Sequence, residues 1–282
     1  MCGIIAILRR PSSRDVPTAE SILTLLVDAT ALLGGPDGSQ MADRVAAAAG
    51  QIAEADRLLG GLPGLLALDR DSGLAGRITA ALADLPDQIA GMEAVLERRV
   101  TTFDGSDSSD GVEAANAALV GLRDAVWAVT RDRIGTHVGV VSLRSSRIAP
   151  SDAGLGVLLS IQQALSAVDR LEVRGRDSAG IQVTVWNHDL AVDDPEVVGR
   201  TVDGLHRTGS VRVLDGGGLA FVVKAAAEIG ELGDNTAVLR AALAADGLLA
   251  RALVAPGVEG SILGHTRWAS VGLISEPNAH PV

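Results

Sequence analysis

The sequence predicts an α+β protein in which a frame of strands and helices is interrupted near its start by a long helical insert. Three observations lead to this prediction. A short apolar strand opens the chain, an alanine-rich region with helical periodicity runs from residue 17 to residue 137, and strands alternate with helices from residue 138 to residue 282. We therefore expect two domains, residues 1–16 with 138–282 and the insert 17–137.

The opening strand spans residues 2–8, CGIIAIL, and RRPSSRDVP ends it with two prolines. In the insert, apolar residues recur at spacings of three and four over 39–59, 77–100 and 111–129, which is typical of amphipathic helices in an antiparallel bundle. Pro86 is expected to kink or divide the second helix, and TTFDGSDSSDG at 101–111 is expected to be a polar loop.

Beyond the insert the sequence predicts a mixture of strands and helices. These are a strand at 137–143, a helix at 155–172, a strand at 179–187, a strand or linker at 209–215, helices at 220–232 and 235–253, and a strand at 260–270.

The composition limits the classes of partner and compartment. The 282 residues include 35 Asp and Glu against 24 Lys and Arg, an acidic balance that argues against nucleic acid as a partner. The single cysteine excludes an internal disulfide. The N-terminus lacks the features of a signal peptide, and no apolar stretch is long enough for a membrane span. We expect a cytoplasmic protein that binds no membrane.

Cys2 directly follows the initiator methionine, and two interpretations of it are open. It is either a small buried apolar residue at the start of a strand, or a nucleophile that becomes the first residue once Met1 is removed. In the second case a thiol and a free α-amine stand on one residue. The amine, with an ordinary pKa of about 7.7–8.0, is then a base for the thiol proton.

Two more stretches stand out from the alanine-rich background. RGRDSAGI, residues 174–181, is by itself a turn between Gly175 and Gly180, with Asp177 and Ser178 as caps. GHTRWAS, residues 264–270, combines an arginine suited to carboxylate capture with a tryptophan that would wall a pocket. A surface arginine beside a packed tryptophan is the other interpretation. The histidines at 265 and 280 are assigned no chemical role.

Residues 2–8, 165–183 and 264–281 together resemble the glutaminase domain of class II glutamine amidotransferases, the N-terminal-nucleophile type. The glutamine–fructose-6-phosphate aminotransferases of that family carry C-G-I, R-G-Y-D-S-A-G and H-T-R-W-A-T-H-G…N-A-H-P blocks. The amidophosphoribosyltransferases carry R-G-Q-D-A-A-G and a tyrosine in place of the tryptophan. The resemblance implies an Ntn-hydrolase-like four-layer αββα sandwich, with strand 2–8 central and strands 179–186 and 260–268 in the same pair of sheets.

The resemblance also implies roles. Cys2 would be the catalytic residue that hydrolyses glutamine to glutamate and ammonia through a thioester. Arg174 and Gly175 would order the site, and the substrate would be held by Arg267, Trp268 and Ser270. The ammonia would serve glucosamine-6-phosphate synthesis from fructose-6-phosphate, in a sugar-isomerase domain that follows in a longer, homo-oligomeric chain. No cofactor and no metal are implied.

The chain also departs from the family pattern. Arg176 stands in place of a tyrosine, and Val271 in place of a histidine. The family's oxyanion-hole asparagine and glycine, and the aspartate that binds the substrate amine, would follow Pro281, so we expect the glutaminase domain to be incomplete at its C-terminal side. The alternative function is a non-catalytic glutaminase-like domain that serves assembly or regulation. For the helical insert we favour a packed spacer over a partner-docking or regulatory bundle.

Overall fold

A computed structural model gives the structure of residues 2–34, 40–101, 109–201, 207–226, 231–269 and 273–281, with the backbone alone for 99–101 and 109–110. The chain divides into two compact units. One comprises Met1–Pro11 with Val138–Val282, and the other comprises Ser12–His137.

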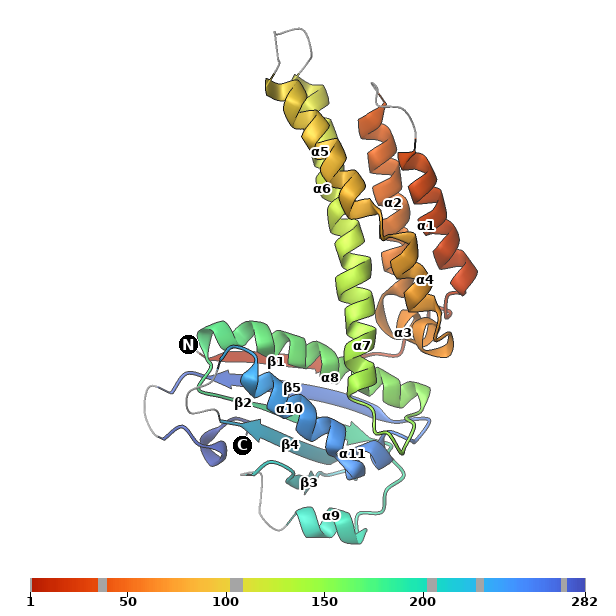
Figure 1. Cartoon of the computed structure of the whole chain (residues 1–282). Helices are drawn as coiled ribbons and strands as arrows, with labels where there is room; N and C mark the ends of the chain where they lie inside the picture. Colours follow the sequence, from red (N-terminus) through yellow and green to blue (C-terminus); the bar gives the residue numbers. More distant parts are fainter. Residues whose placement is uncertain are drawn as a thin grey trace. The chain divides into compact units, whose positions relative to one another are not determined.

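The second unit consists of helices. They are α1 (Ala19–Leu33), α2 (Met41–Leu59), α3 (Gly61–Arg70), α4 (Leu74–Ala81), α5 (Leu85–Thr101) and α6 (Ser109–Trp127), followed by a π-helical segment, Ala128–Ile134 (Figure 1). The face predicted for residues 39–59 is confirmed, because its apolar side chains are all at most 4% exposed: Met41, Val45, Ala48, Ile52 and Leu59. Pro86 divides the segment 77–100 into α4 and α5. It lies in the first turn of α5, where its missing N–H costs no hydrogen bond.

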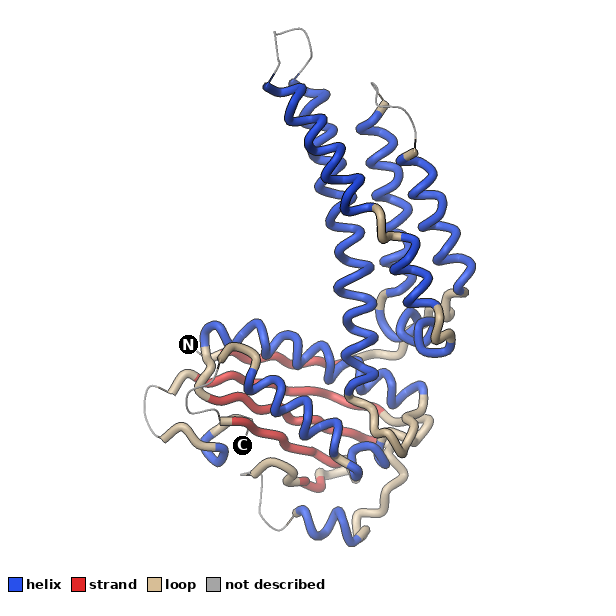
Figure 2. The backbone as a smooth tube through the Cα atoms, viewed as in Figure 1, coloured by secondary structure: helices blue, strands red, loops and turns tan. Residues whose placement is uncertain are grey.

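The first unit contains one five-stranded antiparallel sheet among its described residues. Its strands are β1 (Gly3–Leu8), β2 (Ser178–Trp186), β3 (Val211–Val213), β4 (Leu219–Ala225) and β5 (Glu259–Arg267), in the order β1-β5-β2-β4-β3 (Figure 2). The prediction of a mixed α and β protein is thus confirmed. The prediction that strand 2–8 is central is wrong for this sheet, because β1 forms its edge.

Two long helices cover one face of this sheet. Helix α8 (Asp152–Leu171) packs on β1 and β5, while α10 (Asp234–Ala245) packs on β2 and β4 and against α8 (Figure 1). The side chain of Ser151 caps α8 by accepting a hydrogen bond from the N–H of Gly154 at 3.0 Å. There are also the shorter α-helices α7 (Gly135–Ser142), α9 (Pro195–Arg200) and α11 (Gly247–Ala252), and 3-10 helices at Glu172–Arg174 and Glu276–Asn278.

Two segments differ from the predicted secondary structure: one predicted strand is a helix, and one predicted helix is largely a strand. Residues 137–142 of the segment 137–143, which was predicted as a strand, belong to helix α7. There Gly139 allows close packing, since a Cβ on it would lie 2.3 Å from the Gln162 side chain. Residues 220–232 were predicted as a helix, but β4 occupies Leu219–Ala225, and all seven of its residues are buried. A fully buried strand shows no alternation, so its pattern is not distinguishable from that of a buried helix.

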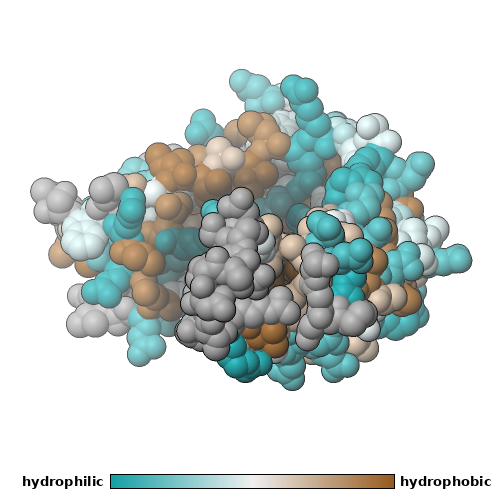
Figure 3. All heavy atoms as spheres, turned by 90° about the horizontal axis from the view of Figure 1, so that it is seen from above, coloured by the Kyte–Doolittle hydropathy of each residue, from teal (hydrophilic) through white to brown (hydrophobic). Residues whose placement is uncertain are grey.

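The surface and the length of the helices bear on the expectation that the chain does not span a membrane. Figure 3 shows hydrophilic side chains over much of the drawn face, with hydrophobic patches between them. Among the helices of the described residues, none has both the length and the apolar character needed to cross a bilayer. The predicted loop at 101–111 lies largely outside the described residues.

Candidate functional site

The sheet brings the predicted site residues from distant parts of the sequence to one of its ends. In β1 and β5, Gly3 is paired with Thr266, and the same register carried one residue further sets Cys2 opposite Arg267. On the other side of β5, Arg267 is paired with Ser178, the first residue of β2. Directly opposed residues in antiparallel strands have Cα atoms roughly 4.5–5.5 Å apart and side chains on the same face. Ser178 and Arg267 are thus neighbours on adjacent strands, and the register extended one residue beyond β1 adds Cys2 to this row.

This row lies on the sheet face that α8 and α10 leave uncovered. A Cβ on Gly3 would lie 2.9 Å from Leu171 of α8 and 2.9 Å from the Thr266 hydroxyl, so residues 3 and 266 face the helix. Because side chains alternate along a strand, residues 2 and 267 face the opposite way. Gly3 therefore leaves room for the side chains of Thr266 and Leu171.

The backbone next to Cys2 is held by a side chain of the predicted strand 260–270. The N–H of Gly3 donates a hydrogen bond to the hydroxyl of Thr266 at 3.2 Å. The thiol of Cys2 is free and exposed. The first of the two interpretations of this cysteine, a buried apolar residue, is therefore wrong for this structure.

The loop before β2 is fixed by residues that the sequence reasoning missed. Glu172 is fully buried and accepts hydrogen bonds at the N-terminus of α10 from Gly233 N (2.7 Å), Thr236 N (3.0 Å) and Thr236 Oγ1 (2.8 Å). The side-chain amide of Asn235 donates to the carbonyl of Arg176 at 2.9 Å. The only sequence signal was the position of Glu172, two residues before the R-G pair.

Within this loop the two predicted ordering residues differ in exposure. Gly175 is buried, and its N–H donates to the Glu172 carbonyl at 3.2 Å, whereas Arg174 is exposed. Gly180 does not flank a turn, as predicted, but lies inside β2. A Cβ on it would lie 2.0 Å from the carbonyl oxygen of His280, so the main chain near the C-terminus packs where a side chain would stand.

Asp177 connects the motif at residues 174–181 to the motif at residues 264–270. Its N–H donates to the carbonyl of Arg267 at 3.2 Å, and its carboxylate accepts from the N–H of Ala269 at 2.6 Å. The aspartate therefore caps the end of β5 rather than the element that follows it in sequence. This contact sets the path of the chain through Trp268, which is 54% exposed.

Arg267 is partly buried, and its guanidinium donates to the carbonyl of Leu273 at 3.5 Å. A guanidinium carries five N–H donors in a planar fork. Ser270 and Val271 lie outside the described residues. The structure thus brings Cys2, Arg267 and the loop after Arg174 to one end of the sheet, and says nothing of the predicted hydroxyl contact.

A second row of residues follows on the same face. Ile4 is paired with His265, and Gly180 is paired with both His265 and Lys224. Nδ1 of His265 and Nζ of Lys224 are buried and have no hydrogen-bond partner among the described residues, and the same holds for Oγ of Ser178 in the first row. Buried polar atoms without partners are uncommon in folded proteins. This end of the sheet can therefore accept hydrogen bonds from, or donate them to, water, a ligand or further polypeptide.

The electrostatics of the second row follow from burial. Burial lowers the pKa of His265, and the neighbouring His280 and Arg267 lower it further; the two imidazole rings lie 4.9 Å apart. Burial also lowers the pKa of the Lys224 ammonium, while the carboxylate of Glu276 acts in the opposite direction. Within the described part of the chain, no three His, Cys, Asp or Glu side chains gather closely enough to hold a metal ion.

Comparisons with known proteins return no relative of this chain: no family model, no curated protein and no solved structure matches it. The arrangement of the residues therefore carries the functional argument. It consists of an exposed thiol at the second residue, an arginine on the neighbouring strand β5, and a loop before β2 whose Asp177 holds the end of β5.

Proposed function

We propose that this chain is a glutaminase domain of the class II amidotransferase type, which hydrolyses glutamine to glutamate and ammonia. The observation that carries the proposal is the pairing of Gly3 with Thr266; extended by one residue, this register sets Cys2 opposite Arg267 on one sheet face. A nucleophile and a carboxylate-binding fork at this spacing can engage the two ends of one glutamine. A thiol that served only for packing would need no such neighbour.

Each residue has a role in the proposed reaction. Removal of Met1 frees the α-amine of Cys2, which takes the thiol proton. The thiolate attacks the side-chain carbonyl carbon of glutamine, the C–N bond breaks, and ammonia leaves with that proton. Water then hydrolyses the glutamyl thioester, which releases glutamate and restores the thiol. Arg267 holds the α-carboxylate of glutamine through paired N–H donors, and Trp268 walls the substrate.

The four-layer αββα sandwich is the fold that we propose for the complete domain. The described residues supply one sheet with helices on one face. On the other face, Ile4 is 69% exposed and Leu8 is 84% exposed. Exposed apolar side chains on the same face of one strand favour burial beneath a further layer, and a second sheet is the layer that an Ntn-hydrolase-like sandwich would supply.

The nitrogen acceptor belongs to the same proposal. The tryptophan at 268 favours the aminotransferases of the sugar-phosphate branch, so we propose that the ammonia is used in glucosamine-6-phosphate synthesis by a sugar-isomerase domain. This part depends on motif resemblance alone and is separable from glutamine hydrolysis.

The experiment is a comparison of ammonia release from glutamine before and after cleavage of an N-terminal extension that ends at Cys2. We expect activity only after cleavage, because an extension converts the α-amine into a non-basic amide. Cys2→Ala, cleaved in the same way, controls for contaminating glutaminase. Arg267→Lys should mainly raise KM, since a point charge replaces a bidentate fork. Equal activity with and without the extension would contradict the proposed mechanism, and a folded, cleaved protein without activity would favour the non-catalytic alternative.

A further inference from the structure

The segment 273–281 lies on the sheet face that α8 and α10 leave uncovered. Its main chain at His280 packs directly on Gly180 of β2, because a Cβ on that glycine would be 2.0 Å from the His280 carbonyl oxygen. Ala279, the preceding residue, is fully buried. A side chain at position 180 would displace the segment, so the glycine of β2 provides a seat for it. Residues 273–281 are called the strap below.

Two polar side chains flank this seat. Gly180 is paired with His265 on β5 and with Lys224 on β4, so both side chains point to the face on which the strap lies. On its other side, His265 is paired with the apolar Ile4 of β1. Nδ1 of His265 and Nζ of Lys224 are buried and have no hydrogen-bond partner among the described residues. Both groups have lost water without gaining a partner, so the seated strap carries a free-energy cost that its lifting would remove.

The strap also places one imidazole ring beside another. The centroid of the His280 ring, on the strap, lies 4.9 Å from that of His265, and the ring planes are tilted by 54°. Burial lowers the pKa of His265, and the neighbouring groups that act in the same direction are His280 and Arg267. Glu276, also on the strap, acts on Lys224, where it opposes the lowering of the pKa by burial. A proton on His265 therefore meets a guanidinium and a second imidazole, and no carboxylate of the described residues acts on it.

We propose that the strap lifts from the sheet when His265 takes up a proton, so that this end of the sheet opens in mildly acidic solution. Lifting separates the two imidazole rings and returns Lys224 to water. It also removes the contact between the Leu273 carbonyl and the guanidinium of Arg267, which is 3.5 Å long in the seated form. The strap is thus a pH-sensitive cover beside the row of Cys2 and Arg267. Lifting does not depend on glutamine hydrolysis, so either proposal can fail without the other.

The size of the effect follows from the titration of one histidine. In the seated form burial holds the pKa of His265 below its ordinary value. In the lifted form the ring is in water, where the ordinary pKa of about 6.5 applies. The seated form is therefore favoured above this pH and loses that advantage as the pH falls through it. Between pH 7.5 and 5.5 the ratio of lifted to seated strap should rise by up to about 10-fold.

The test uses a single thiol as a reporter of lifting. Cys2→Ala removes the only cysteine of the chain, and Ala279→Cys then places one on the strap at a fully buried position. Its rate of reaction with dithiodipyridine is divided by that of Glu259→Cys, an exposed position, in the same background. The ratio corrects for the pH dependence of thiol reactivity and measures protection. We expect protection to be about 3- to 10-fold lower at pH 5.5 than at pH 7.5, and the addition of His265→Gln should make it independent of pH.

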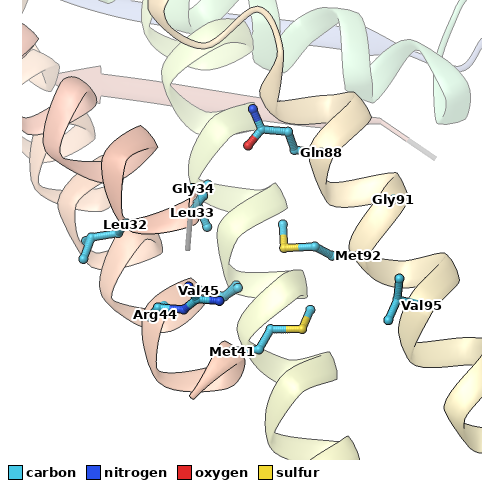
Figure 4. Close-up of a pocket in the computed structure, with 10 residues that line it drawn as sticks. All are labelled: Leu32, Leu33, Gly34, Met41, Arg44, Val45, Gln88, Gly91, Met92 and Val95. Carbon is cyan, nitrogen blue, oxygen red and sulfur yellow. The ribbon is translucent and has the colours of Figure 1, made fainter. Parts of the chain in front are cut away.

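Two buried control thiols separate lifting of the strap from unfolding and from general effects of pH. Val183→Cys lies on the sheet face covered by the helices, at a fully buried position. It is exposed only when the unit unfolds, so it should be at least about 10-fold more protected than Ala279→Cys at both pH values. Met41→Cys lies at a pocket between α1, α2 and α5 of the helical unit, whose lining includes no histidine (Figure 4). Its protection should therefore change by less than about 2-fold between the two pH values.

If Ala279→Cys does not fold, hydrogen exchange of residues 273–281 in the wild type and in His265→Gln gives the same comparison, once it is corrected for the intrinsic pH dependence of exchange. The proposal is overturned by protection of the strap that is equal at pH 7.5 and 5.5. It is equally overturned by an equal fall in the His265→Gln protein or in Met41→Cys, or by equal protection of Ala279→Cys and Val183→Cys at pH 5.5.

Discussion

Glu172 is the residue whose removal should most clearly loosen the loop before β2. Its carboxylate is fully buried and accepts three hydrogen bonds, two of them from Thr236. Glu172→Ala leaves three donors without their acceptor, and each buried unsatisfied group costs about 1–3 kcal/mol. Because water can enter the space of the lost side chain, we expect a loss of about 3–5 kcal/mol. Glu172→Gln keeps one acceptor oxygen but sets its NH₂ against a donor, and should cost about 1–3 kcal/mol.

The assay is urea denaturation of the strand-containing unit, followed through Trp186 fluorescence in a Trp127→Phe, Trp268→Phe background. The two units can unfold separately, so a probe confined to one of them is needed. Glu259→Gln, at an exposed position at the start of β5, serves as the control and should change the free energy of unfolding by less than about 0.5 kcal/mol. A loss in Glu172→Ala no larger than in this control would refute the assignment of Glu172 as the anchor of the loop.

Three further variants test other parts of the structure. Gly180→Ala would set a Cβ 2.0 Å from the carbonyl oxygen of His280, and should lower the free energy of unfolding in urea by about 1–3 kcal/mol. Gly257→Ala, where a Cβ would meet no atom within 4 Å, should leave it unchanged. Equal effects of the two substitutions would contradict the close packing at Gly180. Burial lowers the pKa of His265, so the unfolded chain binds the proton first. The wild type should therefore lose stability as pH falls below about 6.5, and His265→Gln should lack that part of the loss. If the free energy of unfolding changed equally with pH in the wild type and in His265→Gln between pH 7.5 and 5.5, the prediction for His265 would be wrong. Ile52→Ala, at a fully buried position, should destabilise the helical unit by about 2–5 kcal/mol in thermal or urea unfolding followed by circular dichroism, and a loss below about 1 kcal/mol would show that α2 is not the core of that unit.

The sequence predicted the helical unit well because its periodicity is strong and local. The spacing of Met41, Val45, Ala48 and Ile52 identifies the buried face of α2 without any tertiary information. Pro86 marked the boundary between α4 and α5, although the sequence left open whether it would kink or divide the helix.

Periodicity failed where tertiary contacts override it. The valines around residue 140 favour a strand, but Gly139 packs against Gln162 and the segment is helical. The seven residues of β4 are all buried, so no alternation distinguishes them from a helix. The edge position of β1 could not be predicted either, because pairing order depends on contacts across the whole chain and leaves no local signal.

The candidate site was predicted in part for the same reason. Cys2 and Arg267 were conspicuous as residue types in short motifs, and the register of β1 and β5 sets them opposite each other. The residues that hold them, Thr266, Asp177 and Glu172, act through hydrogen bonds to backbone or helix-terminal groups. Such contacts have no characteristic spacing in the sequence, so only the structure identifies them.

The most direct test of the proposed site is alkylation of the mature chain, beginning at Cys2, by a diazoketone analogue of glutamine, measured by intact mass. The analogue needs both a reactive thiol and a pocket that binds the glutamine α-carboxylate, whereas iodoacetamide needs only the thiol. We expect one analogue adduct, located on Cys2. Arg267→Gln should slow its formation about 10- to 100-fold, with the iodoacetamide rate unchanged. Equal analogue rates in the wild type and Arg267→Gln, or no adduct on a thiol that iodoacetamide labels, would contradict the proposal that Cys2 and Arg267 act on one glutamine.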